Sequence, residues 1–141
     1  MPLWIIHHSA GTLSVSDKKI LAKGITKIYT DVGLPPFYVN TLFKEASPGD
    51  IFIGEEPHKK FATVAIRHIA RSIDSEELRL KFLSKVDEVL TPFMEAKQMD
   101  WEYHCIDGPR NLWKTNGIIP PETGSAEEKK WAELNRAVPY Y

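Results

Sequence analysis

The stretch Met1-Pro2-Leu3-Trp4-Ile5-Ile6 places a proline second in the chain and an apolar run directly after it. The run from Leu3 to His8 predicts a strand that is buried on both faces at its start. Initiator methionine is normally removed before a residue as small as proline, so we expect Pro2 to carry a free secondary amine. A strand holds a terminus more firmly than a frayed tail does, which favours a fixed position for that amine.

The amine expected at Pro2 is the first candidate for chemistry. A free α-amino group has a reference pKa of about 7.7–8.0, which apolar surroundings lower and nearby carboxylates raise. An amine that titrates near pH 7 can act as general base, as general acid or as a nucleophile towards carbonyls. Many chains begin Met-Pro by chance, so the dipeptide alone does not distinguish a catalytic terminus from an ordinary one.

The composition is that of an ordinary globular protein. A length of 141 residues predicts one domain, or two small halves that share one core, and 43% hydrophobic with 26% charged residues is typical. A net charge of -1 gives no bulk attraction to nucleic acid or to a membrane surface, so we expect neither as a partner. The single cysteine, Cys105, excludes an intrachain disulfide and fits a reducing compartment. With no signal peptide and no membrane-spanning run in the sequence, we expect a cytoplasmic protein.

The first half of the chain, about residues 1–49, reads as a β-α-β unit. Ser16 is the expected cap of a helix, with Asp17 at its positive end and Gly33 as its stop. A second strand is expected from Tyr38 to Ala46. The apolar residues at helical spacing are Ile20, Leu21, Ile25, Ile28 and Val32.

The second half, about residues 50–107, repeats the order. A capping box at Asp74-Ser75-Glu76-Glu77 opens a helix that runs to about Met94. The expected strands are a short edge strand from Asp50 to Glu55, then Phe61 to Ile69 and Trp101 to Ile106. The apolar stripe of this helix is Leu78, Phe82, Val86, Val89 and Phe93.

An irregular arm, residues 108–141, completes the chain. A capping box at Ser125-Ala126-Glu127-Glu128 predicts a short helix with Trp131 and Leu134 facing inward. The arm is too thin for a core of its own, so we expect it to lie on this or a neighbouring subunit. The predicted fold is α/β over residues 1–141: two consecutive β-α-β units whose sheet is backed by two helices, followed by the arm and its short helix.

Residues along nearly the whole chain carry a family resemblance. They are Pro2, Ala22-Lys23-Gly24-Ile25-Thr26, the segment from Ile66-Arg67 to Arg71-Ser72, Trp101-x-Tyr103, Pro109 with Gly117 and Pro120, and Glu128-x-x-Trp131-x-x-Leu134. In this order the chain resembles the tautomerase superfamily, and within it the cis-3-chloroacrylic acid dehalogenase-like group with its fungal-type oxalocrotonate tautomerases. The resemblance implies a tautomerase-type sheet, a homotrimer, active sites near the amino-terminal proline, and no metal or organic cofactor.

The resemblance also implies site residues. The two arginines that hold the substrate carboxylate match Arg67 and Arg71, although three residues lie between them instead of two. His68 is the alternative partner if the insertion falls elsewhere. The family's tyrosine matches Tyr103, and its first-helix histidine corresponds to Tyr29.

One position departs from the dehalogenase pattern. The glutamate that activates water falls on Thr115, with Asn116 next to it, and neither side chain can serve as a carboxylate base. Hydrolytic dehalogenation is therefore the activity that the resemblance supports least.

Each candidate also has a structural interpretation. Arg67 and Arg71 could be solvated at a strand end, whereas two guanidinia at one site would hold a planar carboxylate bidentately. Tyr29 and Tyr103 could simply be packing residues. The possible ligands of a metal site are His7, His8, His58, His68, His104 and Cys105. Neighbours on a strand point to opposite faces and no zinc-type spacing is present, so we expect no metal.

The amine expected at Pro2, together with the family resemblance, implies a tautomerase that moves a proton between the enol and keto forms of a small carboxylate-bearing 2-oxo acid. Pro2 would be the acid and base, Arg67 and Arg71 would hold the carboxylate, and Tyr103 would support oxyanion charge. One positioned base contributes roughly 10²–10⁴-fold in rate. The alternatives are dehalogenase, hydratase or decarboxylase action on a three-carbon acid, and a catalytically silent trimeric binding protein.

Overall fold

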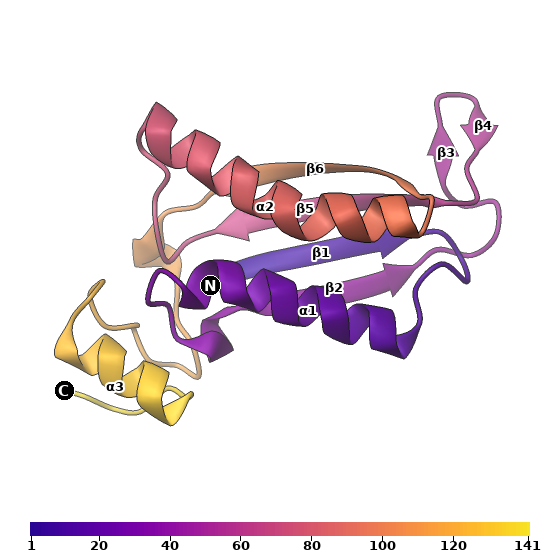
Figure 1. Ribbon diagram of the computed structural model, residues 1–141. Helices are drawn as coiled ribbons and strands as arrows, with labels where there is room; N and C mark the ends of the chain where they lie inside the picture. Colours follow the sequence, from indigo (N-terminus) through magenta and orange to yellow (C-terminus); the bar gives the residue numbers. More distant parts are fainter.

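Four long strands form one mixed sheet in a computed structural model that describes residues 1–141 (Figure 1). They are β1 (Pro2–His8), β2 (Asn40–Glu45), β5 (Phe61–His68) and β6 (Asp100–Asp107). Their order is β2-β1-β5-β6, with β1 parallel to β2, β5 parallel to β6, and β1 antiparallel to β5. Helix α1 (Val15–Thr30) joins the first parallel pair and α2 (Glu76–Ala96) the second. The predicted α/β fold with two consecutive β-α-β units is therefore confirmed.

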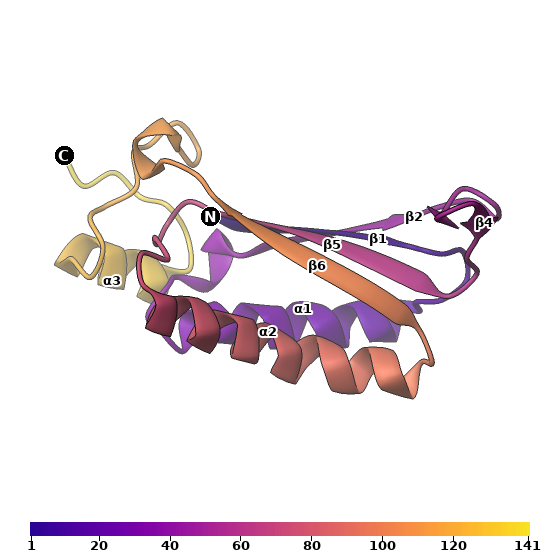
Figure 2. The same ribbon diagram turned by 90° about the horizontal axis from the view of Figure 1, so that it is seen from above.

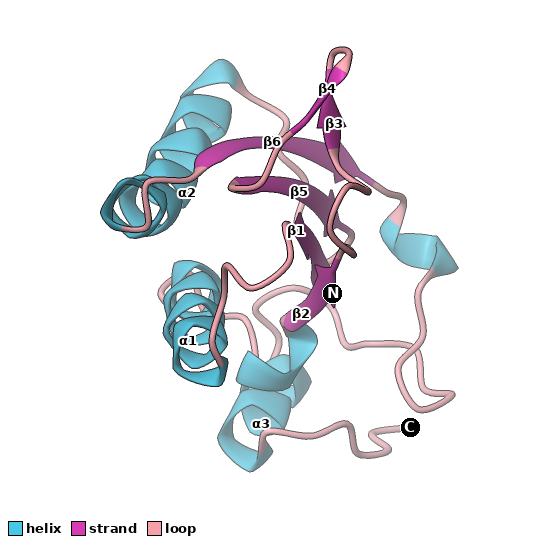
Figure 3. Cartoon of the chain, turned by 90° about the vertical axis from the view of Figure 1, so that its right-hand side faces the viewer, coloured by secondary structure: helices cyan, strands magenta, loops and turns pink.

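Both long helices cover the same face of the sheet (Figure 2). The side chains of Trp4, Ile6, Val64 and Ile66 point to this face and are fully buried. Gly24 lets the helices approach closely, because a Cβ at this position would lie 3.1 Å from a methyl carbon of Val89. No long helix covers the opposite face, to which every second side chain of each strand points (Figure 3).

The start of α1 differs from the prediction. Ser14, not Ser16, is the N-cap: its hydroxyl accepts from the Asp17 N–H at 3.1 Å, and the Asp17 carboxylate accepts from the Ser14 N–H at 2.8 Å. The helix therefore begins at Val15. Its buried stripe is Asp17, Leu21, Ile25 and Tyr29. Ile20 was expected on that stripe but is 61% exposed, because it lies one residue before Leu21 and so on a neighbouring face of the helix. Val32 was also expected there but is 60% exposed, because α1 ends at Thr30 and Val32 lies in the turn that follows.

The second half follows the prediction more closely at α2 than at its first strand. The predicted capping box opens with Asp74, but the N-cap of α2 is the next residue, Ser75, whose hydroxyl accepts from the Leu78 N–H at 3.1 Å. Leu78 itself, expected in the core, is 45% exposed. The edge strand expected over 50–55 is reduced to a small hairpin, β3 (Phe52–Ile53) with β4 (Glu56–Pro57).

A 3-10 turn shortens the strand expected from Tyr38. The segment η1 (Pro36–Tyr38) precedes β2, so pairing with β1 starts only at Asn40. Proline at the first position of this turn sets its backbone, and the Val39 N–H bonds to the Pro36 carbonyl. Tyr38 is consequently buried at the end of the sheet, where only 1% of it is exposed.

The arm packs at the end of the sheet where the chain begins (Figures 1 and 2). It contains η2 (Arg110–Leu112) and α3 (Ala126–Leu134), which Ser125 caps as predicted. Trp113 and Trp131 from the arm belong to the main hydrophobic core of this chain. Leu134 is 44% exposed, so its expected inward position is wrong. None of the helices has the length and apolar character needed to cross a bilayer.

Candidate active site at the amino terminus

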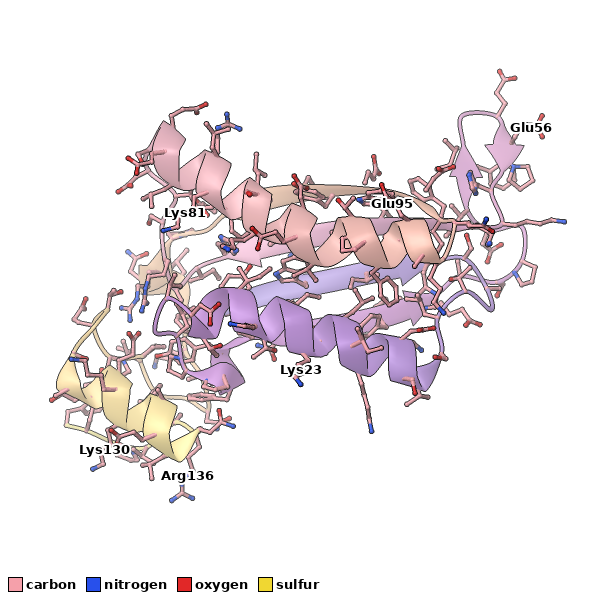
Figure 4. The ribbon with its side chains drawn as sticks, in the orientation of Figure 1. Lys23, Glu56, Lys81, Glu95, Lys130 and Arg136 are labelled. Carbon is pink, nitrogen blue, oxygen red and sulfur yellow. The ribbon has the colours of Figure 1, made fainter.

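A pocket of about 490 Å³ lies beside the first residues of β1. Its walls come from α1, from the first turns of α2 and from the segment that follows β5. Met1, Pro2, Tyr29, His68 and Arg71 line it, and most of the remaining lining is apolar. Lys81, which Figure 4 labels near the start of α2, adds a cation to this lining. The pocket is therefore suited to a ligand with an apolar body and an anionic group.

A buried hydrogen-bond chain forms one wall. The Trp4 indole N–H donates to the Tyr29 oxygen at 2.8 Å, and the Tyr29 hydroxyl lies 2.5 Å from His68 Nε2. Because Tyr29 already accepts from Trp4, we assign its proton to the bond with His68, which makes Nε2 the acceptor. Burial lowers the pKa of His68 to about 4 and raises the pKa of Tyr29. Both side chains are thus neutral and fixed at neutral pH.

Arg71 is paired within the chain. Its guanidinium donates to both carboxylate oxygens of Glu128, at 2.8 and 3.3 Å, and to the Thr123 hydroxyl at 3.2 Å. Glu128 is only 2% exposed and also accepts from the Gly124 N–H at 3.0 Å. The arm therefore orients Arg71 and balances its charge.

Arg67 lies on the other side of the sheet from the pocket. It pairs in register with Leu3, while its neighbour His68 pairs with Pro2, and adjacent residues of a strand point to opposite faces. Arg67 is exposed and His68 is buried. Within one chain the structure brings Pro2, His68 and Arg71 together, and it separates Arg67 from them.

Tyr103 does not line the pocket of its own chain. Its hydroxyl donates to the Asp87 carboxylate on α2 at 2.9 Å, and burial, followed by this bond, raises the pKa of Tyr103 to about 12. Thr115 and Asn116 lie in the arm, in a tight turn closed by bonds between Thr115 and Ile118. Asn116 adopts a left-handed backbone there, with φ of 49°.

The side chains of Tyr38 and Arg110, near the amino terminus, were not among the predicted site residues. Burial, followed by the charges of Arg110 and Arg71, lowers the pKa of the Met1 amine to about 4. Tyr38 is almost fully buried, and its hydroxyl has no hydrogen-bond partner. Arg110 directly follows Pro109, one of the residues that carry the family resemblance, and this neighbourhood is the only signal for it in the sequence.

One group of side chains has the composition of a metal site. His68, Cys105 and Asp107 present ligand atoms within 4.8 Å of one another, and His68 Nδ1 lies 3.7 Å from Asp107 Oδ1. Burial, with a smaller contribution from the charge of Asp107, raises the pKa of the Cys105 thiol to about 11. A protonated thiol is a poor metal ligand, so the expectation of no metal stays our prediction.

Comparisons with known proteins agree with this architecture. A family model described as "Putative oxalocrotonate tautomerase enzyme" matches residues 1–136. Among solved structures, a probable enzyme from the thermophilic fungus Aspergillus fumigatus is 47% identical, with a TM-score of 0.95 over 99% of this chain and 98% of that chain. RhCC from Rhodococcus jostii RHA1 is 37% identical, with a TM-score of 0.94 over 98% and 99%. A search of curated proteins finds no match.

More distant structures share the fold alone. N1, a member of the cis-3-chloroacrylic acid dehalogenase family, is 17% identical, with a TM-score of 0.74 over 94% of this chain and 97% of that chain. A fused 4-OT protein solved as a symmetric trimer is 19% identical, with a TM-score of 0.65 over 83% and 94%.

Proposed function

This chain belongs to the oxalocrotonate tautomerase-like family of the tautomerase superfamily, and we propose that it moves a proton between the enol and keto forms of a small 2-oxo acid. The observation that carries this proposal is the position of Pro2. It is buried at the first residue of β1 and lines an apolar pocket of about 490 Å³ that also contains Arg71. Removal of Met1 would expose a secondary amine at that wall.

The surroundings of the amino terminus support a neutral amine. Burial and two nearby guanidinia lower the pKa of the Met1 amine to about 4, and the amine of a processed chain would start only one residue further on. The neutral amine can take the proton of an enol hydroxyl and, as ammonium, deliver a proton to the neighbouring carbon. The net change moves one proton, and no cofactor takes part.

The pocket supports a substrate with an apolar substituent. Phe82, Ile28 and Leu34 are among its lining residues, and its volume exceeds what a three-carbon acid would fill. An aryl 2-oxo acid fits this description, with its carboxylate towards the positively charged side of the pocket. Thr115, which has no carboxylate, gives dehalogenase or hydratase action no support. We therefore expect very slow halide release from cis-3-haloacrylates.

We propose that the active assembly is a homotrimer. The fold is shared with a 4-OT protein solved as a trimer, and the sheet face opposite the helices carries the exposed apolar residues Leu42 and Ile106. In such an assembly Arg67, which lies on the open face with Ile106, would be available to a neighbouring copy, whereas Tyr103 is directed to Asp87 of α2 in its own chain. The unpaired Cys105 supports the cytoplasm as the proposed location.

The experiment that tests the proposal is Pro2→Ala in protein freed of Met1. Alanine still provides an amine, but a primary one with a different basicity and less rigidity than the secondary amine of proline. Enol-to-keto conversion of an aryl 2-oxo acid should therefore fall by roughly 10²-fold or more. Pro57→Ala, in the exposed β3–β4 hairpin, is the matched control and should leave the rate unchanged. Equal rates for Pro2→Ala and the unmutated protein would remove Pro2 from the mechanism. No activity in any variant would favour the binding-protein alternative.

A further inference from the structure

Met1 fills the part of the pocket next to the Pro2 nitrogen. Its carbonyl accepts from the Ile69 N–H at 3.0 Å, and its side chain lines the pocket and packs against the core. Removal of this residue therefore opens a space of one amino acid directly beside the Pro2 nitrogen. The groups that surround this space decide which part of a substrate enters it.

The cations around this space are not equivalent. Arg71 is neutralised by Glu128, which is buried and accepts two hydrogen bonds from it. Arg110 donates to the carbonyls of Pro120 and Pro121, and its nearest carboxylate is Glu122 at 3.9 Å. Glu122 is 91% exposed, so water screens its charge and the pair is weak. Arg110 therefore has no close counter-ion, as is also true of Lys81 in the pocket lining.

Two hydrogen-bond donors at this end of the sheet lack acceptors. Arg110 Nε and the Tyr38 hydroxyl are both buried without a hydrogen-bond partner. Tyr38 is held in place by edge-to-face contacts with Trp113, at 4.8 Å between ring centroids, and with Trp131, at 6.3 Å. Donors left unpaired in a buried position destabilise a protein unless a ligand or water satisfies them.

The charged groups that act on Tyr38 are the same ones that act on the Met1 amine. Glu128, Arg110 and Arg71 influence the pKa of both groups. The contacts agree with this, because Tyr38 packs against Trp131 of α3, and Glu128 of the same helix pairs with Arg71, which lines the pocket together with Met1. An uncompensated guanidinium with a free N–H and a phenol with a free O–H make a site for a carboxylate, because both donate and one is charged.

We propose that Arg110 and Tyr38 form the subsite that binds the substrate carboxylate in the space vacated by Met1, with Glu128 positioning Arg71 beside it. The inference rests on the proposed function for the removal of Met1 and for the 2-oxo acid as substrate. It assigns the carboxylate to the arm and η1 of the same chain, in place of the Arg67–Arg71 pair expected from the sequence. The apolar part of the substrate then extends along Phe82.

The test measures binding, so that it does not depend on turnover. The probe is 3-phenyllactate, which carries the carboxylate and the aryl group of the substrate but has no ketone, together with its uncharged amide. Titration calorimetry with Met1-free protein compares Arg110→Gln, Tyr38→Phe and a matched control, Arg136→Gln. Arg136 is exposed just after α3 (Figure 4), and its side chain makes no hydrogen bond or ion pair within the chain.

We expect Arg110→Gln to weaken phenyllactate binding by about 10- to 100-fold, as for the loss of a charge-assisted hydrogen bond, and Tyr38→Phe by a few-fold. The amide should bind alike to the unmutated protein and to Arg110→Gln. Arg136→Gln should leave the affinity for both the acid and the amide unchanged. Protein that retains Met1 should not bind phenyllactate, because Met1 fills the space.

Unchanged phenyllactate binding in Arg110→Gln, or an equal loss for acid and amide, would overturn the subsite. Arg110→Lys controls for misfolding, because lysine keeps the positive charge but lacks the bidentate guanidinium. Its affinity for phenyllactate should lie between those of the unmutated protein and Arg110→Gln. A protein that binds phenyllactate through Arg110 but converts no enol would retain the subsite and refute the proposed tautomerase. Turnover that depends on Pro2 but not on Arg110 would retain the proposed tautomerase and refute the subsite.

Discussion

At the scale of single residues, the site depends on buried polar pairs that the sequence could not assign. Tyr29 and His68 were both candidates, but their hydrogen bond depends on how β1, β5 and α1 are aligned, which no local pattern specifies. The opposite orientation of Arg67 and His68 could have been predicted, because both were placed on one strand and neighbours alternate between its faces. The partner of Arg71 could not, because Glu128 is 57 residues away.

The neutral state of His68 predicts a pH dependence of stability. Its pKa is about 4 in the folded chain and 6.5 as its ordinary value, so the unfolded chain binds more protons between these values. The free energy of unfolding should therefore fall as the pH decreases from about 6.5 to about 4, by about 3 kcal/mol from this residue. Urea unfolding at several pH values measures it, and His68→Gln should lose this part of the slope. An identical slope in the variant would mean that His68 does not titrate differently on folding.

The Arg71–Glu128 pair predicts a coupled loss of stability. Removal of one partner leaves the other charge in a mostly buried position, which typically destabilises by about 3–5 kcal/mol. Arg71→Met and Glu128→Gln should each destabilise strongly, and the double variant by clearly less than the sum. The exposed pair Lys27–Asp31, 71% and 55% exposed, is the control and should couple by less than about 1 kcal/mol. Additive losses at Arg71 and Glu128 would contradict the pairing.

At the scale of secondary-structure elements, hydrophobic periodicity predicted the order of the long strands and helices, while their ends were less secure. A serine caps each of the three α-helices, and local patterns selected Ser125 correctly but chose Ser16 over Ser14 and opened the capping box of α2 at Asp74, one residue before Ser75. Asp17 suits either reading, because an acidic residue is favourable anywhere in the first turn. The start of β2 was missed because the chain first turns through η1, a segment with no periodic signal. The helix α1 ends at Thr30, three residues before the stop expected at Gly33.

The cap of α1 gives a prediction with a built-in control. Ser14→Ala removes a hydroxyl that accepts from the Asp17 N–H, so the free energy of unfolding should fall by about 0.5–2 kcal/mol. Ser16→Ala removes an exposed serine from the same turn and should change stability by less than about 0.5 kcal/mol. Thermal or urea unfolding compares the two. A larger loss of stability in Ser16→Ala than in Ser14→Ala would contradict the observed cap and support Ser16, the cap predicted from the sequence.

At the scale of the whole molecule, the arm completes the core and one face of the sheet stays open. Trp113 and Trp131 belong to the core that the sheet and long helices form, which supports our proposal that residues 1–141 are one domain. The sheet ends in two unpaired edges, β2 and β6, and its open face exposes 47% of Leu42 and 54% of Ile106. Composition could not show this exposure, because it arises from the strand register.

The exposed sheet face predicts association. Edges and apolar faces of this kind are normally covered in a closed assembly, for which we propose the homotrimer. Sedimentation equilibrium at micromolar concentration should give three times the mass of one chain. Ile106→Lys places a charge on the face and should shift the protein towards smaller species, whereas Leu112→Lys, at an arm residue that is 80% exposed, should not. A stable monomer with full activity would contradict the proposed trimer.

The central claim is that the amine of Pro2 performs the chemistry, and one comparison tests it most directly. Two proteins that differ only in Met1, with their termini verified by intact mass, are assayed for enol-to-keto conversion of an aryl 2-oxo acid at pH 7. In the chain that retains Met1 the Pro2 nitrogen is an amide without basicity, and Met1 lines the pocket. We predict conversion by the Met1-free protein and no rate above buffer for its partner. Equal rates for the two proteins would contradict the account.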